Sequence, residues 1–100
     1  MPEVIDNPEQ KRYELRDGAR LLGFAEYRPV TGALLFPHTE IEEGHEGQGL
    51  ASLLIRTALD DARARSLNVI PMCPFVAGFI RRHPEYLSLV QPAQRTMFKL

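Results

Sequence analysis

The stretch IEEGHEGQGLASLL (residues 41–54) joins a short apolar strand to a long amphipathic helix through a loop that contains glycines. Gly47 and Gly49 let the backbone turn tightly and approach a ligand closely. The first N–H groups of a helix have no partner within the helix, and the helix dipole is positive there, so the loop suits a phosphate or pyrophosphate. The glycines are equally compatible with a flexible loop that only starts a helix.

The helix itself is predicted from Gly49 to Ser66, because the apolar residues that follow the loop recur at helical spacing. These residues are Leu50, Leu53, Leu54, Ala58 and Ala62. Two other phosphate-binding loops are excluded, since the chain has neither G-x-x-x-x-G-K-[ST] nor G-x-G-x-x-G.

The N-terminal half of the chain has the pattern of antiparallel hairpins. We expect residues 1–9 to form a loose arm, and strands over residues 10–16, 20–29 and 33–41. Turns at residues 17–18 (Asp-Gly) and 31–32 (Thr-Gly) would join the strands. Gly23 suggests a bulge in the second strand, and Pro37 suggests a bend in the third.

The C-terminal half alternates between strands and helices. We expect a strand over residues 67–72, a short helix over residues 75–83 that Pro84 ends, and a last strand over residues 95–100. The order β-β-β-α-β-α-β predicts an α/β (α+β) fold, a single domain over residues 10–100 in which helices flank a mixed sheet.

Net charge, apolar runs and cysteine content limit the classes of protein to which this chain can belong. The net charge is −1, so a basic nucleic-acid-binding face is not expected. No run approaches the roughly 18 apolar residues of a membrane span, and the N-terminus lacks the pattern of a secretory signal. The single cysteine, Cys73, fits a reducing compartment, so we expect a cytoplasmic protein without membrane or nucleic-acid partners.

Residues 41–54 resemble the acetyl-CoA signature of GNAT acetyltransferases, in which a strand, then [QR]-x-x-G-x-[GA], leads into a helix. Glu46 takes the first place of that signature, Gly49 the fourth and Ala51 the sixth. The stretches HTEI (38–41), CPF (73–75) and HPEY (83–86) extend the resemblance to a small stand-alone NATD-type subfamily, over most of the chain from residue 13 to residue 86.

This resemblance implies a minimal GNAT fold and an N-acetyltransferase that moves an acetyl group from acetyl-CoA to an amine. The pyrophosphate of coenzyme A would lie on the N–H groups of the loop and first helical turn, and the pantetheine arm would run beside the strand that ends at Ile41. The loop residues are Gly47, Gln48, Gly49, Leu50 and Ala51. Phe75 and Phe79 are expected in the core, where either could also line the pantetheine channel.

Three residues are candidates for catalysis. Cys73 precedes a predicted helix N-terminus, where the helix dipole favours a thiolate, and it could carry the acyl group; its alternative role is that of a small buried residue. His38 could act as a base, or could simply bond a backbone group. Glu40 is the other candidate base, or else a solvated carboxylate. Thr39 and Glu40 are expected to alternate faces with His38.

The chain departs from the GNAT pattern at three points. Glu46 stands where Gln or Arg is usual, and the helices that shape the acceptor pocket in larger GNAT enzymes are missing, so the acceptor side is expected to be open or to depend on a partner chain. The tyrosine that usually reprotonates the CoA thiolate would fall on Ile80, whereas Tyr86 lies beyond Pro84.

Two other functions remain open from the sequence: a non-catalytic acyl-CoA-binding or regulatory module, and a small interaction protein without a ligand. No metal is expected, because His38, His45 and Cys73 match no zinc-binding spacing. The acceptor amine and the oligomeric state cannot be read from the sequence.

Overall fold

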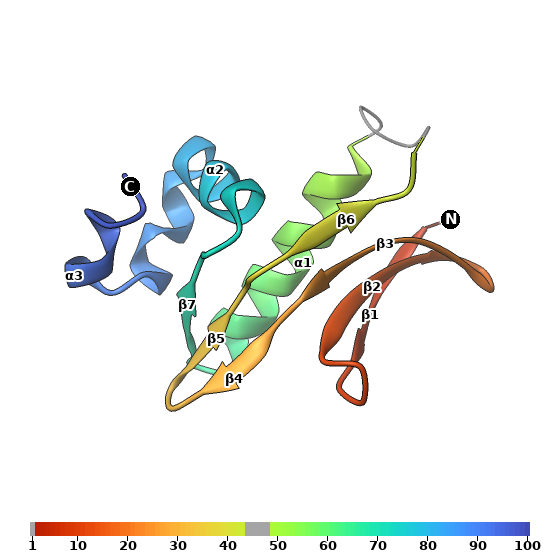
Figure 1. Cartoon of the computed structure of the whole chain (residues 1–100), viewed down its shortest axis with the longest axis horizontal. Coiled ribbons are helices and arrows are strands. Elements are labelled where there is room, and N and C mark those ends of the chain that lie inside the picture. Colours follow the sequence, from red (N-terminus) through yellow and green to blue (C-terminus); the bar gives the residue numbers. More distant parts are fainter. Residues whose placement is uncertain (1, 44–48) are drawn as a thin grey trace.

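A computed structural model describes residues 2–43 and 49–100. The expected hairpins, long helix and strand–helix second half are confirmed (Figure 1). The elements in chain order are β1 (Glu3–Asn7), β2 (Arg12–Asp17), β3 (Arg20–Glu26), β4 (Arg28–Val30), β5 (Ala33–Leu35), β6 (Thr39–Ile41), α1 (Leu50–Ala64), β7 (Asn68–Ile70), α2 (Pro74–Arg82), the 3-10 helix η1 (Pro84–Leu89) and α3 (Pro92–Arg95).

The first sheet has four antiparallel strands in the order β1-β2-β3-β6. The predicted Asp-Gly turn joins β2 to β3, and Gly18 has a φ of 62°, a left-handed conformation that glycine adopts without a steric penalty. The bulge predicted at Gly23 is also present. The register shifts between Leu15 and Arg16, which pair with Gly23 and Leu21, so that Leu22 is the extra residue on β3.

The loose N-terminal arm was a wrong expectation, because residues 3–7 form β1 and pair with β2 along its whole length. The two prolines, Pro2 and Pro8, flank this strand and do not interrupt it. A side-chain contact also ties β1 to the core, since Asp6 accepts hydrogen bonds from the hydroxyl of Tyr27 at 2.6 Å and from Arg65 at 2.8 Å.

The second sheet has three strands in the order β4-β5-β7, with β7 parallel to β5. The strand expected over residues 33–41 is therefore divided at Phe36-Pro37-His38, as the proline suggested. Its first half, β5, belongs to the second sheet. Its second half, β6, turns away and pairs with β3 of the first sheet.

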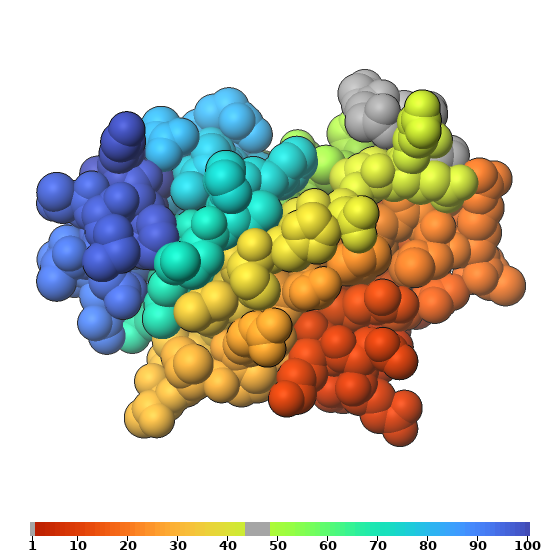
Figure 2. Space-filling model, in the orientation of Figure 1, coloured from red at the N-terminus to blue at the C-terminus, as the bar shows by residue number. Residues whose placement is uncertain are grey.

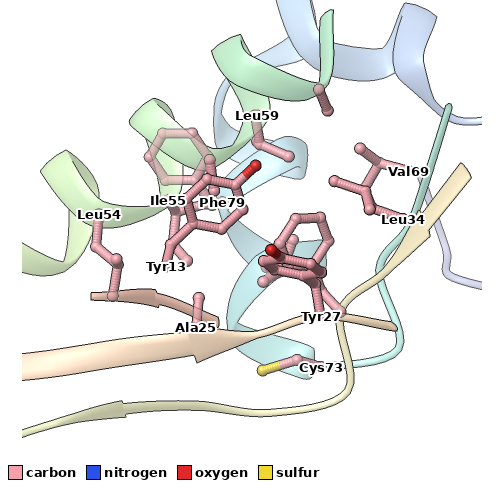
Figure 3. Close-up of a cluster of buried hydrophobic side chains, with 14 of the residues drawn as sticks. Tyr13, Ala25, Tyr27, Leu34, Leu54, Ile55, Leu59, Val69, Cys73 and Phe79 are labelled. Atoms are coloured by element: carbon pink, nitrogen blue, oxygen red, sulfur yellow. The ribbon is translucent and has the colours of Figure 1, made fainter. Parts of the chain in front are cut away.

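Helix α1 covers one face of the strands and supplies much of the core (Figure 3). Its buried positions recur at helical spacing, and they are Leu54, Ile55, Ala58, Leu59 and Ala62. The predicted apolar face is confirmed only in part, because Leu50 is half-buried and Leu53 is 39% exposed. None of the described helices lies over the other face of the first sheet. Figure 2 is viewed from that side, with the strands in front and α1 largely hidden behind them.

The C-terminal residues 95–100 do not form the expected strand. Pro92–Arg95 is helical as α3, and the chain then continues in turns to its end. Lys99 has a φ of 58°, which is incompatible with an extended strand. The guanidinium of Arg81 donates to the carbonyls of Phe98 and Lys99 at 3.0 and 3.1 Å, so a side chain on α2 satisfies groups that a strand partner would otherwise bind.

Glu14 and its neighbours form a network of paired charges on the sheet face that α1 does not cover. This carboxylate is only 3% exposed, because long neighbouring side chains lie over it. It accepts hydrogen bonds from Arg12 at 2.7 Å, Arg16 at 2.8 Å and Asn7 at 3.1 Å. The guanidinium of Arg12 also lies 4.8 Å from the centre of the Phe24 ring. These paired side chains thus shield part of the sheet face from solvent.

Replacing Glu14 with Gln should lower the free energy of unfolding by about 1 to 3 kcal/mol at neutral pH, because the donors lose a charged acceptor. Burial alone would raise the pKa of Glu14, but the hydrogen bonds from Arg16, Arg12 and Asn7 outweigh it and hold this pKa below its ordinary value. The carboxylate therefore stabilises the fold above the unfolded-state pKa of about 4.3, and this stabilisation is lost as the pH falls through the lower folded-state pKa.

Urea denaturation of the wild type and Glu14→Gln at several pH values measures this effect. The difference between their midpoints should shrink as the pH falls from neutral to about 3. Glu9→Gln, an exposed change in the turn after β1, should leave the midpoint unchanged. A difference that stays constant with pH would contradict the role of the Glu14 charge.

None of the helices in the described ranges combines the length and the apolar character that crossing a membrane requires.

Candidate functional site

The two sheets diverge at Phe36, and the candidate site lies at this divergence. The N–H of Phe36 donates to the carbonyl of Ile70 at 2.9 Å, and the N–H of Cys73 donates to the carbonyl of Phe36 at 2.8 Å. Beyond this point β6 runs toward β3, whereas the chain after β7 turns into α2 (Figure 1). No described strand pairs with the side of β6 that faces away from β3, so β6 is an edge strand.

The backbone N–H and C=O groups of β6 alternate between the edge paired with β3 and the free edge. The carbonyl of His38 accepts a hydrogen bond from β3 at 2.9 Å, and the N–H of Glu42 donates one to β3 at 2.7 Å. Because bonding alternates along an antiparallel pair, Thr39 and Ile41 fall at positions whose N–H and C=O groups point away from β3. These are the groups with which an amide-containing ligand could pair as an added strand.

Close packing of β3 against β6 requires Gly23. A Cβ atom at this position would lie 2.6 Å from the carbonyl oxygen of Glu40 and 2.8 Å from the Cδ1 atom of Ile41. Any side chain would therefore push β6 outward. Gly23 thus fixes where the edge at Ile41 lies.

The N-terminus of α1 follows the end of β6 in the chain. Gly49 caps the helix with a φ of 75°, and no side chain caps it. The first intrahelical bond runs from Leu53 N–H to the Gly49 carbonyl at 3.1 Å, so the N–H groups of Leu50 and Ala51 have no partner within the helix. The first turn has no acidic residue, which favours an anion here. Of the loop residues expected to bind the cofactor, Gly47 and Gln48 lie outside the described residues.

The three predicted catalytic residues do not come together. His38 and Glu40 lie on the uncovered sheet face, 52% and 59% exposed, with the His38 Nε2 atom 3.4 Å from the Glu40 Oε2 atom. The His38 ring also meets Phe24 edge-on, with 6.1 Å between the ring centres. Thr39 points to the opposite face, as alternation along the strand predicts, whereas His38 and Glu40 share a face.

Cys73 lies on the same side of β6 as Thr39. It is 5% exposed and stands at the margin of the buried cluster, at the N-cap of α2 (Figure 3). Its Sγ atom donates to the Oγ1 atom of Thr39 at 3.6 Å. Thr39 is thus a site residue that the sequence interpretation missed. The signal for it was present, because Thr39 alternates with the two residues that were chosen as bases.

The two phenylalanines of α2 differ, although both were expected to be core residues that could contact the cofactor. Phe75, in the first turn, is 41% exposed. Phe79 is completely buried, with its ring centre 4.2 Å from that of His83 and 5.9 Å from that of Tyr86. The expectation that Phe79 is a core residue is therefore confirmed, and protein atoms enclose its whole surface.

No tyrosine replaces the acid that the GNAT pattern would place at Ile80. Ile80 is buried, and each of the chain's three tyrosines donates its hydroxyl to an aspartate. These pairs are Tyr13 with Asp61 at 2.5 Å, Tyr27 with Asp6 at 2.6 Å and Tyr86 with Asp60 at 2.7 Å.

Burial and the aspartates keep these tyrosines protonated. Burial first, then the hydrogen bond to Asp60, raises the pKa of Tyr86. In the same order, burial and Asp6 raise the pKa of Tyr27 to about 12. Tyr13 is also raised, by burial and then Asp61. All three hydroxyls are therefore committed to structural bonds with β1 or α1.

A hollow of about 280 Å³ lies beside β3 and β6. Its lining combines apolar side chains with carboxylates, and it consists of Leu21, Leu22, Gly23, Phe24, Glu40, Ile41, Glu42 and Glu43. One of these carboxylates, Glu42, forms an ion pair with Arg20 at 2.6 Å. The lining is acidic overall and suits a positively charged group better than an anion.

Comparisons with known proteins agree with this geometry. A family model described as GCN5-related N-acetyl-transferase matches residues 12–89. Protein NATD1 from Bos taurus is 32% identical over 57 residues, which are 55% of this chain and 50% of that protein. The match thus spans about half the length of that relative.

A solved structure supports the fold. The solution NMR structure of a GCN5-like protein from Staphylococcus aureus has a TM-score of 0.70 at 21% identity, and the match covers 89% of this chain and 87% of that chain. At this level of identity the likeness concerns the fold, which is a mixed α+β arrangement in both proteins.

Proposed function

The chain belongs to the GCN5-related N-acetyltransferase family, and we propose that it transfers an acetyl group from acetyl-CoA to an amine. The observation that carries this proposal is the unpaired edge of β6 followed in the chain by the N-terminus of α1. The amides of the pantetheine arm would pair with the backbone groups of Thr39 and Ile41. The pyrophosphate would bind the N–H groups of Gly49, Leu50 and Ala51, together with the loop residues Gly47 and Gln48.

The division of side chains between the two faces of β6 supports a direct transfer. A ligand along the edge of a strand has one side toward each sheet face. The amine would approach over the uncovered face, where His38 or Glu40 can accept its proton. The acidic hollow beside β3 and β6 would favour a protonated amine near this site. The departing sulfur would lie toward the other face, on the side of Cys73 and Thr39.

The alternative function, a non-catalytic acyl-CoA-binding module, has one observation in its favour: all three tyrosines are held by aspartates. Two measurements separate the functions. Calorimetry with CoA tests binding, which both functions require. Release of free thiol from acetyl-CoA in the presence of a panel of amines tests transfer. Binding without thiol release would support the module, and absence of binding would overturn both functions.

Replacing His38 with Gln should lower kcat by about 10² to 10⁴-fold if His38 is the base, with little change in the affinity for CoA. His83→Gln is the matched control, because His83 is packed against Phe79 on α2. The measurement is the rate of thiol release across the pH range. If Glu40→Gln abolishes transfer while His38→Gln does not, Glu40 is the base. Wild-type activity in both variants would exclude both residues as the base.

A further inference from the structure

We propose that Thr39 is a positioning residue, which holds the Cys73 thiol as a proton donor for the departing CoA sulfur. In this role Cys73 gives its proton to the leaving group and does not attack the thioester. The inference rests on the proposed function and assigns a role to a residue that the sequence interpretation did not choose.

The contact that carries the inference joins two elements at the base of the split. Thr39 is the first residue of β6, and Cys73 is the N-cap of α2. The thiol donates to the Thr39 Oγ1 atom at 3.6 Å, and the backbone N–H of Cys73 is fixed by its bond to Phe36. Thr39 also presents its own backbone groups at the free edge of β6. Its hydroxyl therefore holds the thiol beside the strand along whose edge the acyl donor would lie.

A nucleophilic cysteine needs a base that removes its proton. His38 and Glu40 are exposed on the opposite face of β6, and their nearest titratable contact is with each other at 3.4 Å. His83, in turn, is stacked on Phe79 and lies 4.0 Å from Glu85. Among the described residues, the polar side chain that contacts Cys73 is the Thr39 hydroxyl, which accepts a hydrogen bond but is a negligible base. In the described part of the chain, Cys73 therefore has a hydrogen-bond acceptor beside it and no base.

A proton donor is needed on this side of the site. When the tetrahedral intermediate collapses, the carbon–sulfur bond breaks and its electron pair goes to the CoA sulfur. The S–H group of Cys73, which donates to Thr39 in the free protein, would turn to the CoA sulfur; its S–H bond would then break and its proton would move to that sulfur. Both groups are alkyl thiols, so the proton would pass between two groups of the same chemical type. Cys73 would recover a proton from the one that the amine releases, passed through the base and solvent.

Thr39→Val and Thr39→Ser test the positioning role, because valine keeps the shape of threonine and removes the hydroxyl, whereas serine keeps the hydroxyl. We expect Thr39→Val to lower kcat about tenfold with the KM for acetyl-CoA unchanged, and Thr39→Ser to restore it. If Thr39 were only structural, Thr39→Val would lower the melting temperature and Thr39→Ser would not restore kcat. Equal kcat in the wild type and Thr39→Val would overturn the inference.

Cys73→Ala tests the proton donor itself. With acetyl-CoA as the donor, kcat should fall by about a hundredfold or more. With the acetyl thioester of 4-nitrothiophenol, whose thiolate leaves without a proton, the wild type and Cys73→Ala should have rates within a few fold, after subtraction of the uncatalysed rate. The acceptor amine is the same in both assays.

Intact-mass analysis of the wild type with acetyl-CoA and no amine separates the remaining outcomes. No acetyl group should appear on Cys73, and a stoichiometric adduct would show that Cys73 is the nucleophile and overturn the inference. A wild type that binds CoA but acetylates no amine would instead contradict the proposed function, and the inference with it. An active wild type with a fully active Cys73→Ala would contradict the inference alone.

Discussion

Gly49→Val should weaken the binding of CoA by about a hundredfold or more, the largest effect on binding that we expect from one substitution. Gly49 caps α1 at a φ of 75°, and a Cβ atom there would meet no atom of the described residues within 4 Å, its chain neighbours apart. We propose that the side chain would project into the space of the pyrophosphate. The loss combines this obstruction with displacement of the N–H groups at Leu50 and Ala51. Isothermal titration calorimetry with CoA measures it.

Gly32→Val is the matched control for this change. Gly32 has a φ of 72°, and a Cβ atom there also meets nothing within 4 Å, but it lies in the turn between β4 and β5. Both variants carry the same backbone strain, of about 1 to 2 kcal/mol. Gly32→Val should therefore lose similar stability and keep its affinity for CoA. Equal affinity in the two variants would mean that the N-terminus of α1 is not the pyrophosphate site.

Phe79→Ala should lower the free energy of unfolding by about 3 to 5 kcal/mol, because it removes a fully buried ring and leaves a cavity. Phe75→Ala should leave stability nearly unchanged, since Phe75 is 41% exposed. If Phe75 lines the pantetheine channel, its removal should also weaken CoA binding by about tenfold, equal to about 1.4 kcal/mol. Urea denaturation and calorimetry on both variants measure the two effects.

The two phenylalanines thus have opposite expected effects. A stable Phe79→Ala variant with weakened CoA binding would contradict the buried placement of Phe79. Unchanged CoA affinity in Phe75→Ala would remove Phe75 from the proposed site, without affecting the pyrophosphate contacts at Gly49.

Local patterns predicted the elements whose conformation is set by nearby residues. The turn at Gly18, the bend at Pro37 and the long amphipathic helix α1 follow from glycine, proline and apolar spacing. The ends of the chain could not be predicted in this way. Residues 3–7 become a strand because β2 offers a partner, and residues 95–100 remain in turns because Arg81 of α2 binds their carbonyls.

The candidate site was predictable only in part for the same reason. Alternation along β6 is local, and it correctly separates Thr39 from its neighbours. The meeting of Thr39 with Cys73 spans 34 residues of sequence and depends on the split between the two sheets. The exposure of Phe75 and the burial of Phe79 also depend on packing, because residues four apart share a helix face and only Phe79 is covered by η1.

The central claim is that an acyl-CoA lies along the free edge of β6 and reaches the N-terminus of α1. Amide NMR of the ¹⁵N-labelled protein during titration with CoA tests it most directly. We expect the amides of Thr39, Ile41, Leu50 and Ala51 to shift and become protected from solvent exchange, whereas that of Glu40, directed toward β3, should change little. Saturable shifts confined to other surfaces, with Thr39 and Ile41 still in free exchange, would contradict it.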